Sequence, residues 1–107
     1  MTRPLLQDVL PELAEELRTL LEKDGESQLA AQVSSLPIVD RCRCGADFCT
    51  TFYTVPKPKG AYGAKHETIA LDIEDGYLNV DENDGEIICV EVLYHDEIRH
   101  KLLRLLP

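Results

Sequence analysis

Apolar residues recur at helical spacing near the start of the chain. Residues 8–23 read DVLPELAEELRTLLEK. The apolar positions in this segment, mostly three or four residues apart, are Val9, Leu10, Leu13, Leu17, Leu20 and Leu21. This spacing predicts an amphipathic helix. Asp8 is suited to cap its start, Pro11 falls in a first turn that needs no backbone N–H, and Gly25 is suited to end it.

Two further helices are predicted. Residues 26–35 place Leu29 and Val33 on one side of a second helix, which ends before a proline. The first two helices would form a hairpin with a short link. Near the other end of the chain, DEIRHKLLRLL at 96–106 predicts a short C-terminal helix, since apolar residues share a face and basic residues favour its last turns.

Between these helices the helical period disappears. Segments rich in β-branched and aromatic residues are predicted to be strands. They are 37–44, 48–55, 68–73, 77–81 and 86–94. The sequence therefore predicts a single α+β domain of 107 residues. In it, a helical hairpin at 1–36 packs on a mostly antiparallel sheet of about five strands at 37–94, followed by a short helix at 95–107.

Turn signals predict the register of the last three strands. Asp75-Gly76 suits a two-residue turn that sets Leu71 opposite Val80, and residues 83–85 suit a three-residue loop that sets Val80 opposite Ile88. One face of this meander would then carry Ile69, Leu71, Ile73, Leu78, Val80, Ile88, Val90 and Val92. The other face would carry Thr68, Asp72, Glu74, Asn79, Asp81, Cys89 and Glu91. This division is typical of an antiparallel sheet covered by helices on its apolar side.

Three of the four cysteines lie in RCRCGADFCT, residues 41–50. A hairpin turning at Ala46-Asp47 would pair Cys44 with Cys49 and Cys42 with Thr51. Strand alternation then places all three thiols on one face, with the side chains of Arg41 and Arg43 pointing the other way. A three-residue turn would send Cys49 to the opposite face, so the convergence depends on the turn.

This stretch leaves three interpretations open. The first is a zinc site, because zinc takes four tetrahedral thiolate or imidazole ligands. Its ligands would be Cys42, Cys44 and Cys49, with Cys89, His66 or His95 as the fourth. The second is redox chemistry at the cross-strand pair of Cys44 and Cys49. The third is plain packing, because a reduced cysteine behaves as a small apolar side chain.

The charge balance narrows the classes of partner. There are 20 acidic and 11 basic residues, for a net charge of −9. Such a protein repels phosphate backbones, which disfavours nucleic acid, and attracts a basic protein partner. Candidate surfaces are the polar face of the meander, for a basic partner, and the lysine-rich loop at 56–67, for an acidic one. No apolar run approaches the ~20 residues of a membrane span, and the N-terminus lacks a signal-peptide core, so we expect a cytoplasmic protein with reduced cysteines.

Two segments resemble known proteins. LNVDENDGEIICVEVL, residues 78–93, resembles a hairpin of small bacterial proteins of unknown function, whose strands read D-x-D-x-x-G-x-I-x-x-x-E-I-L. Asp81, Gly85, Ile87 and Glu91 lie near the matching places, with a different spacing after Asp81. DRCRCGADFC, residues 40–49, is similar to a cysteine-bearing hairpin of uncharacterised actinobacterial proteins. These resemblances imply a bacterial source and an α+β fold, and they bring no activity.

The leading functional hypothesis is a small acidic protein-binding module without catalytic activity, for which no cofactor is expected. The first alternative is a zinc-stabilised module that uses Cys42, Cys44 and Cys49. The second alternative is a thiol-dependent redox protein.

Overall fold

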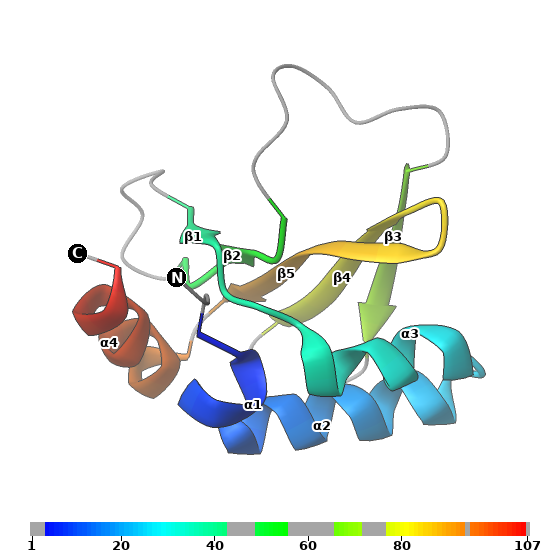
Figure 1. Ribbon diagram of the computed structural model, residues 1–107, viewed down its shortest axis with the longest axis horizontal. Helices are drawn as coiled ribbons and strands as arrows, with labels where there is room; N and C mark the ends of the chain where they lie inside the picture. The colour runs from blue at the N-terminus through cyan, green and yellow to red at the C-terminus, as the bar shows by residue number, and fades with distance from the viewer. Residues whose placement is uncertain (1–3, 43–48, 56–65, 72–76, 94, 107) are drawn as a thin grey trace.

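A computed structural model describes residues 4–42, 49–55, 66–71, 77–93 and 95–106 (Figure 1). The protein has an α+β fold, as the sequence predicts. The helical elements are α1 (Leu6–Val9), α2 (Pro11–Lys23), α3 (Ser27–Gln32), the 3-10 turn η1 (Val33–Ser35) and α4 (Asp96–Leu105). The strands are β1 (Asp40–Arg41), β2 (Phe52–Tyr53), β3 (His66–Leu71), β4 (Tyr77–Asn83) and β5 (Glu86–Leu93).

The predicted first helix is divided by its proline. Leu10 leaves helical geometry, with φ −129° and ψ 66°, because a residue that precedes proline avoids the α region. Pro11 then becomes the first residue of α2, and Asp8 lies within α1 instead of capping the longer helix. Gly25 ends α2 as predicted, at φ +81°. The amides of Gly25 and Glu26 donate to the carbonyls of Glu22 and Leu21, which is the Schellman pattern.

The strands form one antiparallel sheet in the order β1-β2-β5-β4-β3. The β1–β2 hairpin has the predicted register, with Arg41 opposite Phe52, and the Cys42 amide donates to the Thr51 carbonyl at 2.8 Å. The predicted turn at 46–47 lies outside the described residues. Pairing of β2 with β5 joins this hairpin to the meander, with Tyr53 opposite Cys89.

The predicted meander register is wrong by two residues between β3 and β4, and by two residues between β4 and β5 as far as Asp81. Val80 pairs with Ile69 and with Val90. Between β4 and β5 the loop has two residues, Asp84 and Gly85, both at positive φ, which is a type I′ turn. Between β3 and β4 the last described pair is Leu71 opposite Leu78, and the predicted turn at Asp75-Gly76 lies outside the described residues. A shift of two keeps each side chain on its predicted face.

A bulge in β5 changes which isoleucine of that strand faces the main core. Asp81 pairs with Cys89, but its neighbour Glu82 pairs with Ile87, so Ile88 is the extra residue. As a result Ile87, and not Ile88, joins the main hydrophobic core. Ile88 is buried outside that core.

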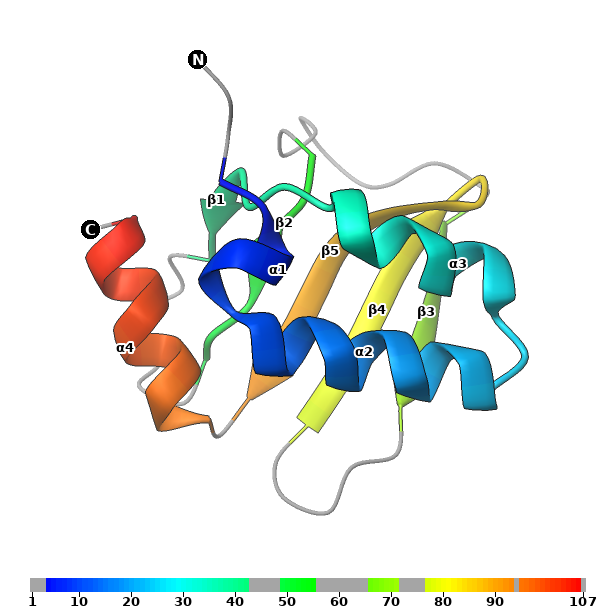
Figure 2. The same cartoon turned by 60° about the horizontal axis from the view of Figure 1, so that its bottom comes forward.

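The helices cover one face of the sheet, as predicted (Figure 2). α2 and α3 lie across β3, β4 and β5, and α4 lies beside β1 and β2. The core between these layers includes Leu6, Leu13, Leu17, Leu21, Leu29, Ile38, Phe52, Leu78, Val80, Val90, Val92, Ile98 and Leu102. No helix in the described part of the chain is long and apolar enough to cross a membrane.

One polar side chain ties α3 to the β4–β5 turn. The Gln32 amide nitrogen donates to the Gly85 carbonyl at 2.6 Å, and its oxygen accepts from the Ile87 amide at 3.0 Å. These two bonds satisfy backbone groups of the turn and of the bulged strand. The position of the hairpin tip over α3 is therefore fixed by specific hydrogen bonds.

Candidate functional site

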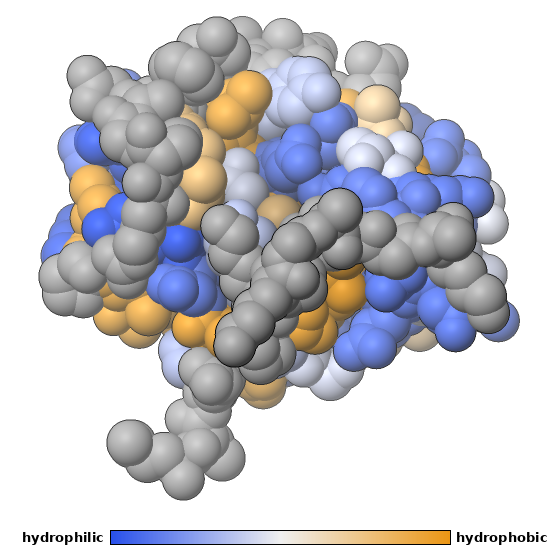
Figure 3. All heavy atoms as spheres, turned by 90° about the horizontal axis from the view of Figure 1, so that it is seen from above, coloured by the Kyte–Doolittle hydropathy of each residue, from blue (hydrophilic) through white to orange (hydrophobic). Residues whose placement is uncertain are grey.

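The sheet face turned away from α2 and α3, here called the distal face, carries most of the titratable groups of the sheet. One row of paired residues crosses all five strands of the sheet. It consists of Asp40, Tyr53, Cys89, Asp81 and Thr68. The next row includes Glu91 opposite Asn79. Seen from this side, hydrophilic residues gather where β3 lies, at the right of Figure 3.

Asp81 is the centre of a hydrogen-bonded cluster on the distal face. Its side chain is buried, and Oδ1 accepts from the Thr68 hydroxyl at 2.5 Å and lies 3.0 Å from His66 Nε2. Burial raises the pKa of Asp81, but hydrogen bonds from Glu91, Thr68 and His66 outweigh it, so the net pKa is lowered. Asp81 is therefore the ionised member of the cluster.

Glu91 is the protonated partner of Asp81. Its hydrogen bond with Asp81, together with burial and the Asp81 charge, raises the pKa of Glu91 from 4.5 to about 7. Two carboxyl groups can form a hydrogen bond only when one of them carries a proton. The pair therefore shares one proton up to neutral pH, and His66 adds a third titratable group on the edge strand β3.

Because of this shared proton, we expect the free energy of unfolding to depend on pH. Between pH 4.5 and about 7, folded Glu91 keeps a proton that the unfolded chain has lost, so its contribution to stability falls as pH rises through this window. We expect Glu91→Gln, which can donate the same hydrogen bond at every pH, to exceed the wild type in unfolding free energy by about 2 kcal/mol at pH 8.5 and to match it near pH 5.

Urea unfolding at several pH values tests this expectation, with Glu16→Gln on the exposed side of α2 as the control. If the unfolding free energies of the wild type and Glu91→Gln changed with pH in parallel, Glu91 would not hold the proton.

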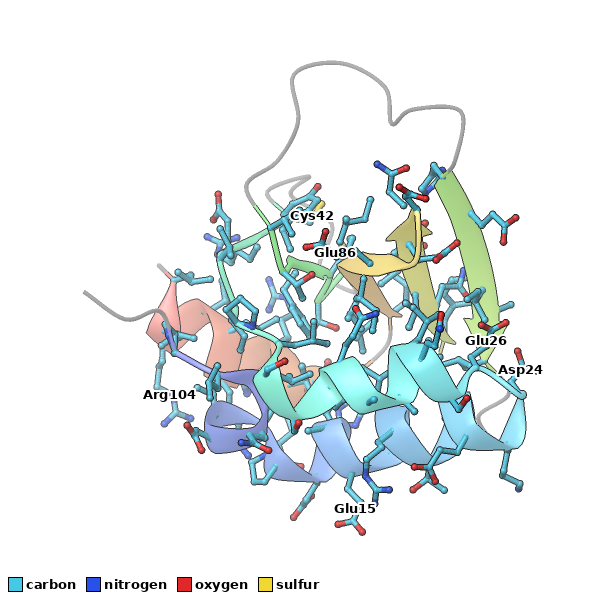
Figure 4. The ribbon with its side chains drawn as sticks, turned by 45° about the vertical axis from the view of Figure 1, so that its right-hand side comes forward. Glu15, Asp24, Glu26, Cys42, Glu86 and Arg104 are labelled. Carbon is cyan, nitrogen blue, oxygen red and sulfur yellow. The ribbon has the colours of Figure 1, made fainter. Side chains whose placement is uncertain are left out.

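The structure brings Cys89 onto the face of the other cysteines. Cys89 pairs with Tyr53, and Cys42 and Cys49 share the face of Tyr53 by strand alternation. Cys42 lies away from α2 and α3 in Figure 4. Cys89 is buried, and burial together with the charges of Asp81, Glu91 and Cys42 raises the pKa of its thiol. Cys89 is thus a neutral thiol at physiological pH and a poor nucleophile.

The zinc hypothesis remains a prediction. Cys44 lies outside the described residues, so the predicted three-cysteine set cannot be placed as a whole. Within the segments that are described, no three cysteine, histidine or carboxylate side chains are arranged to hold a metal ion. His66, one of the predicted fourth ligands, instead contacts Asp81.

Cys42 and Cys49 line a pocket of about 70 Å³ between the β1–β2 hairpin and α4. Its lining residues are Arg41, Cys42, Cys49, Thr50, Thr51, Arg99, Leu102 and Leu103. The sequence placed the Arg41 side chain on the opposite side of the strand from the thiols, and Arg41 does pair with buried Phe52. Arg41 nevertheless lines the same pocket as the cysteines, and α4 adds a second arginine, Arg99, which no sequence pattern associates with them.

A third feature is an acidic end, opposite α4. We define it by Asp24, Glu26, Glu67, Glu82, Asp84 and Glu86. Asp24 and Glu26 lie at the α2–α3 turn (Figure 4), and the other four lie around the β4–β5 turn, at the same end of the molecule in Figures 1 and 2. Glu67 pairs directly across from Glu82. Two like charges that face each other across neighbouring strands destabilise the fold, so the presence of this pair is not explained by fold stability.

The acidic surface therefore differs from the predicted one. Asp81 is buried and Glu91 shares its proton, and neither offers an exposed charge to a partner. Asp72 and Glu74, the other predicted members, lie outside the described residues.

Comparisons with protein-family models, with curated proteins and with solved structures find no match to this chain.

Proposed function

We propose that this protein is a small binding module that holds a basic protein partner through its acidic end. The observation that carries the proposal is the pair of Glu67 and Glu82, directly opposed on neighbouring strands. A cationic side chain of a partner placed between two such carboxylates would relieve their repulsion, which is a gain available only on binding.

The surroundings of that pair support the same partner chemistry. Asp84 and Glu86 are exposed on the adjoining turn, and Asp24 is exposed on the α2–α3 turn. The net charge of −9 would also accelerate the encounter with a basic protein at low ionic strength.

The test is a matched pair of charge reversals. A protein captured from host extract would be purified and its affinity measured at several salt concentrations. We expect Glu67→Lys with Glu86→Lys to weaken binding at least about 100-fold, and binding to weaken as salt increases. The control variant, Glu12→Lys with Glu16→Lys, makes an equal charge change on the exposed side of α2. It should weaken binding less than about threefold. Equal losses in both double variants would refute a specific acidic site.

A further inference from the structure

β3 lies at one edge of the sheet and is a long, regular strand (Figure 1). It has six residues, pairs with β4 without a register shift from His66 to Leu71, and contains neither proline nor lysine. In the part of the chain that the structure describes, no strand pairs with its outer side. Proline, lysine, a bulge or a very short strand usually prevents pairing at an edge, so β3 is a template for another strand.

The backbone groups on the outer side of β3 include those of Thr68 and Ala70. The two-residue β4–β5 turn closes on a hydrogen-bonded pair, so Asn83 directs its backbone groups to β5 and Glu82 directs its own to β3. Glu82 pairs with Glu67 there. Alternation along β3 then turns the N–H and C=O of Thr68 and Ala70 away from β4. Both residues are exposed, so a partner strand can reach these groups.

The charges along this edge favour a basic strand. Glu67 is exposed and shares the side of Ile69, which packs against the core. A residue of an added strand that faced Glu67 directly would lie on the same side of the sheet, at the distance of a cross-strand pair. A lysine or arginine at that position would offset the repulsion between Glu67 and Glu82. A second copy of this chain has a net charge of −9, which disfavours it as the occupant.

We propose that the basic partner adds an extended segment to β3 as a sixth strand of the sheet, with lysine or arginine at alternate positions. The added strand runs antiparallel to β3, as neighbouring strands do throughout the described sheet. Main-chain bonds to Thr68 and Ala70 supply affinity, and the charges that face Glu67 supply specificity. This inference rests on the proposed function, because it describes the form in which the basic partner meets the acidic end.

The probe is an acetylated and amidated heptapeptide in which lysine and valine alternate, with lysine at both ends. When its lysines lie on the side of Glu67, its valines face Thr68 and Ala70 and direct their N–H groups to β3. N-methylation of the valines therefore removes bonds to β3, whereas N-methylation of the lysines changes only the outer side of the added strand. A ¹⁵N NMR titration would measure the affinity of each peptide and show which amides of the protein shift.

We expect the unmethylated peptide to shift the amides of Thr68 and Ala70 and to slow their hydrogen exchange. N-methylation of the valines should weaken binding at least about tenfold, and N-methylation of the lysines less than about threefold. Ala70→Pro removes one outer N–H, a change that an edge strand tolerates, and should also weaken binding at least about tenfold. Ala70→Val, which retains the N–H, should not. Circular dichroism would check that each variant is folded.

The outcomes separate this inference from the proposed function. Equal affinities of the two methylated peptides would overturn strand addition, and the acidic end would remain the binding site if Glu67→Lys with Glu86→Lys still abolished binding. Binding that survived this double charge reversal would instead refute the acidic end and, with it, the basic strand. The inference would also be overturned if millimolar peptide shifted no amide, or if sedimentation showed wild-type dimers that Ala70→Pro abolished, since a second copy would then occupy the edge.

Discussion

Replacing Phe52 with alanine is expected to lower the free energy of unfolding by about 3–5 kcal/mol. Phe52 is fully buried, at 0% exposure, and belongs to the main core. It pairs with Arg41 on one side and Val90 on the other, so it also joins the β1–β2 hairpin to the rest of the sheet. Its removal leaves a large cavity at this junction, which the short strands around it cannot close.

Urea unfolding monitored by circular dichroism would measure the loss. If Phe52→Ala does not fold at all, Phe52→Leu, which retains most of the volume, should fold with a loss of about 1–2 kcal/mol. Tyr77→Ala is the control, because Tyr77 is a large side chain that is 44% exposed. A loss for Phe52→Ala no larger than that of Tyr77→Ala would contradict its place in the core.

Asp81→Asn is expected to lower the free energy of unfolding by about 3 kcal/mol at neutral pH. Asp81 accepts hydrogen bonds from Thr68 and Glu91 and contacts His66, and bonds to an ionised acceptor are stronger than those to an amide. Because the folded-state pKa of Asp81 is lowered, its stabilising effect is present above pH 3.8 and is lost as pH falls. The cost of Asp81→Asn should therefore shrink in acid.

A second measurement distinguishes this role from simple packing. Without an anionic neighbour, the pKa of Glu91 should fall from about 7 toward its ordinary value, and a ¹³C NMR titration of its carboxyl would show the shift. Asp84→Asn, which makes the same chemical change on the exposed turn, should alter neither stability nor the Glu91 titration by much. An unchanged Glu91 titration in Asp81→Asn would mean that the two carboxyls are not coupled.

Local features of the fold could be predicted from the sequence. Gly25 marked the end of α2, and alternation along β4 and β5 separated Val80 and Val90 from Asp81 and Glu91. The division of the first helix at Leu10 was not predicted, although proline restricts the residue before it. The register of the β1–β2 hairpin was predicted, but that of the β4–β5 pair was not, because a two-residue turn at Asp84-Gly85 and a bulge at Ile88 leave the apolar alternation almost unchanged.

The assembly of the candidate sites depended on contacts that leave no local pattern. Pairing of β2 with β5 places Cys89 on the same face as Cys42 and Cys49, although Cys89 lies far from both in the sequence. Docking of α4 brings Arg99 to the pocket. The proton shared by Asp81 and Glu91 likewise needs three neighbours from two other strands, which composition alone cannot indicate.

β2 and β5 are joined by only two residue pairs, Phe52 with Val90 and Tyr53 with Cys89, and they lie far apart in the sequence. This pairing affects the order in which the sheet folds. The β3–β4–β5 meander joins consecutive strands and closes short loops, whereas β2 must find a strand much further along the chain. The meander can therefore form early, and the β1–β2 hairpin docks later, secured by hydroxyl bonds from Thr50 and Thr54 to β5 carbonyls at 2.8 Å. Until that step Cys89 lacks its neighbour Tyr53 on β2, so its thiol is protected from oxidation only once the hairpin has docked.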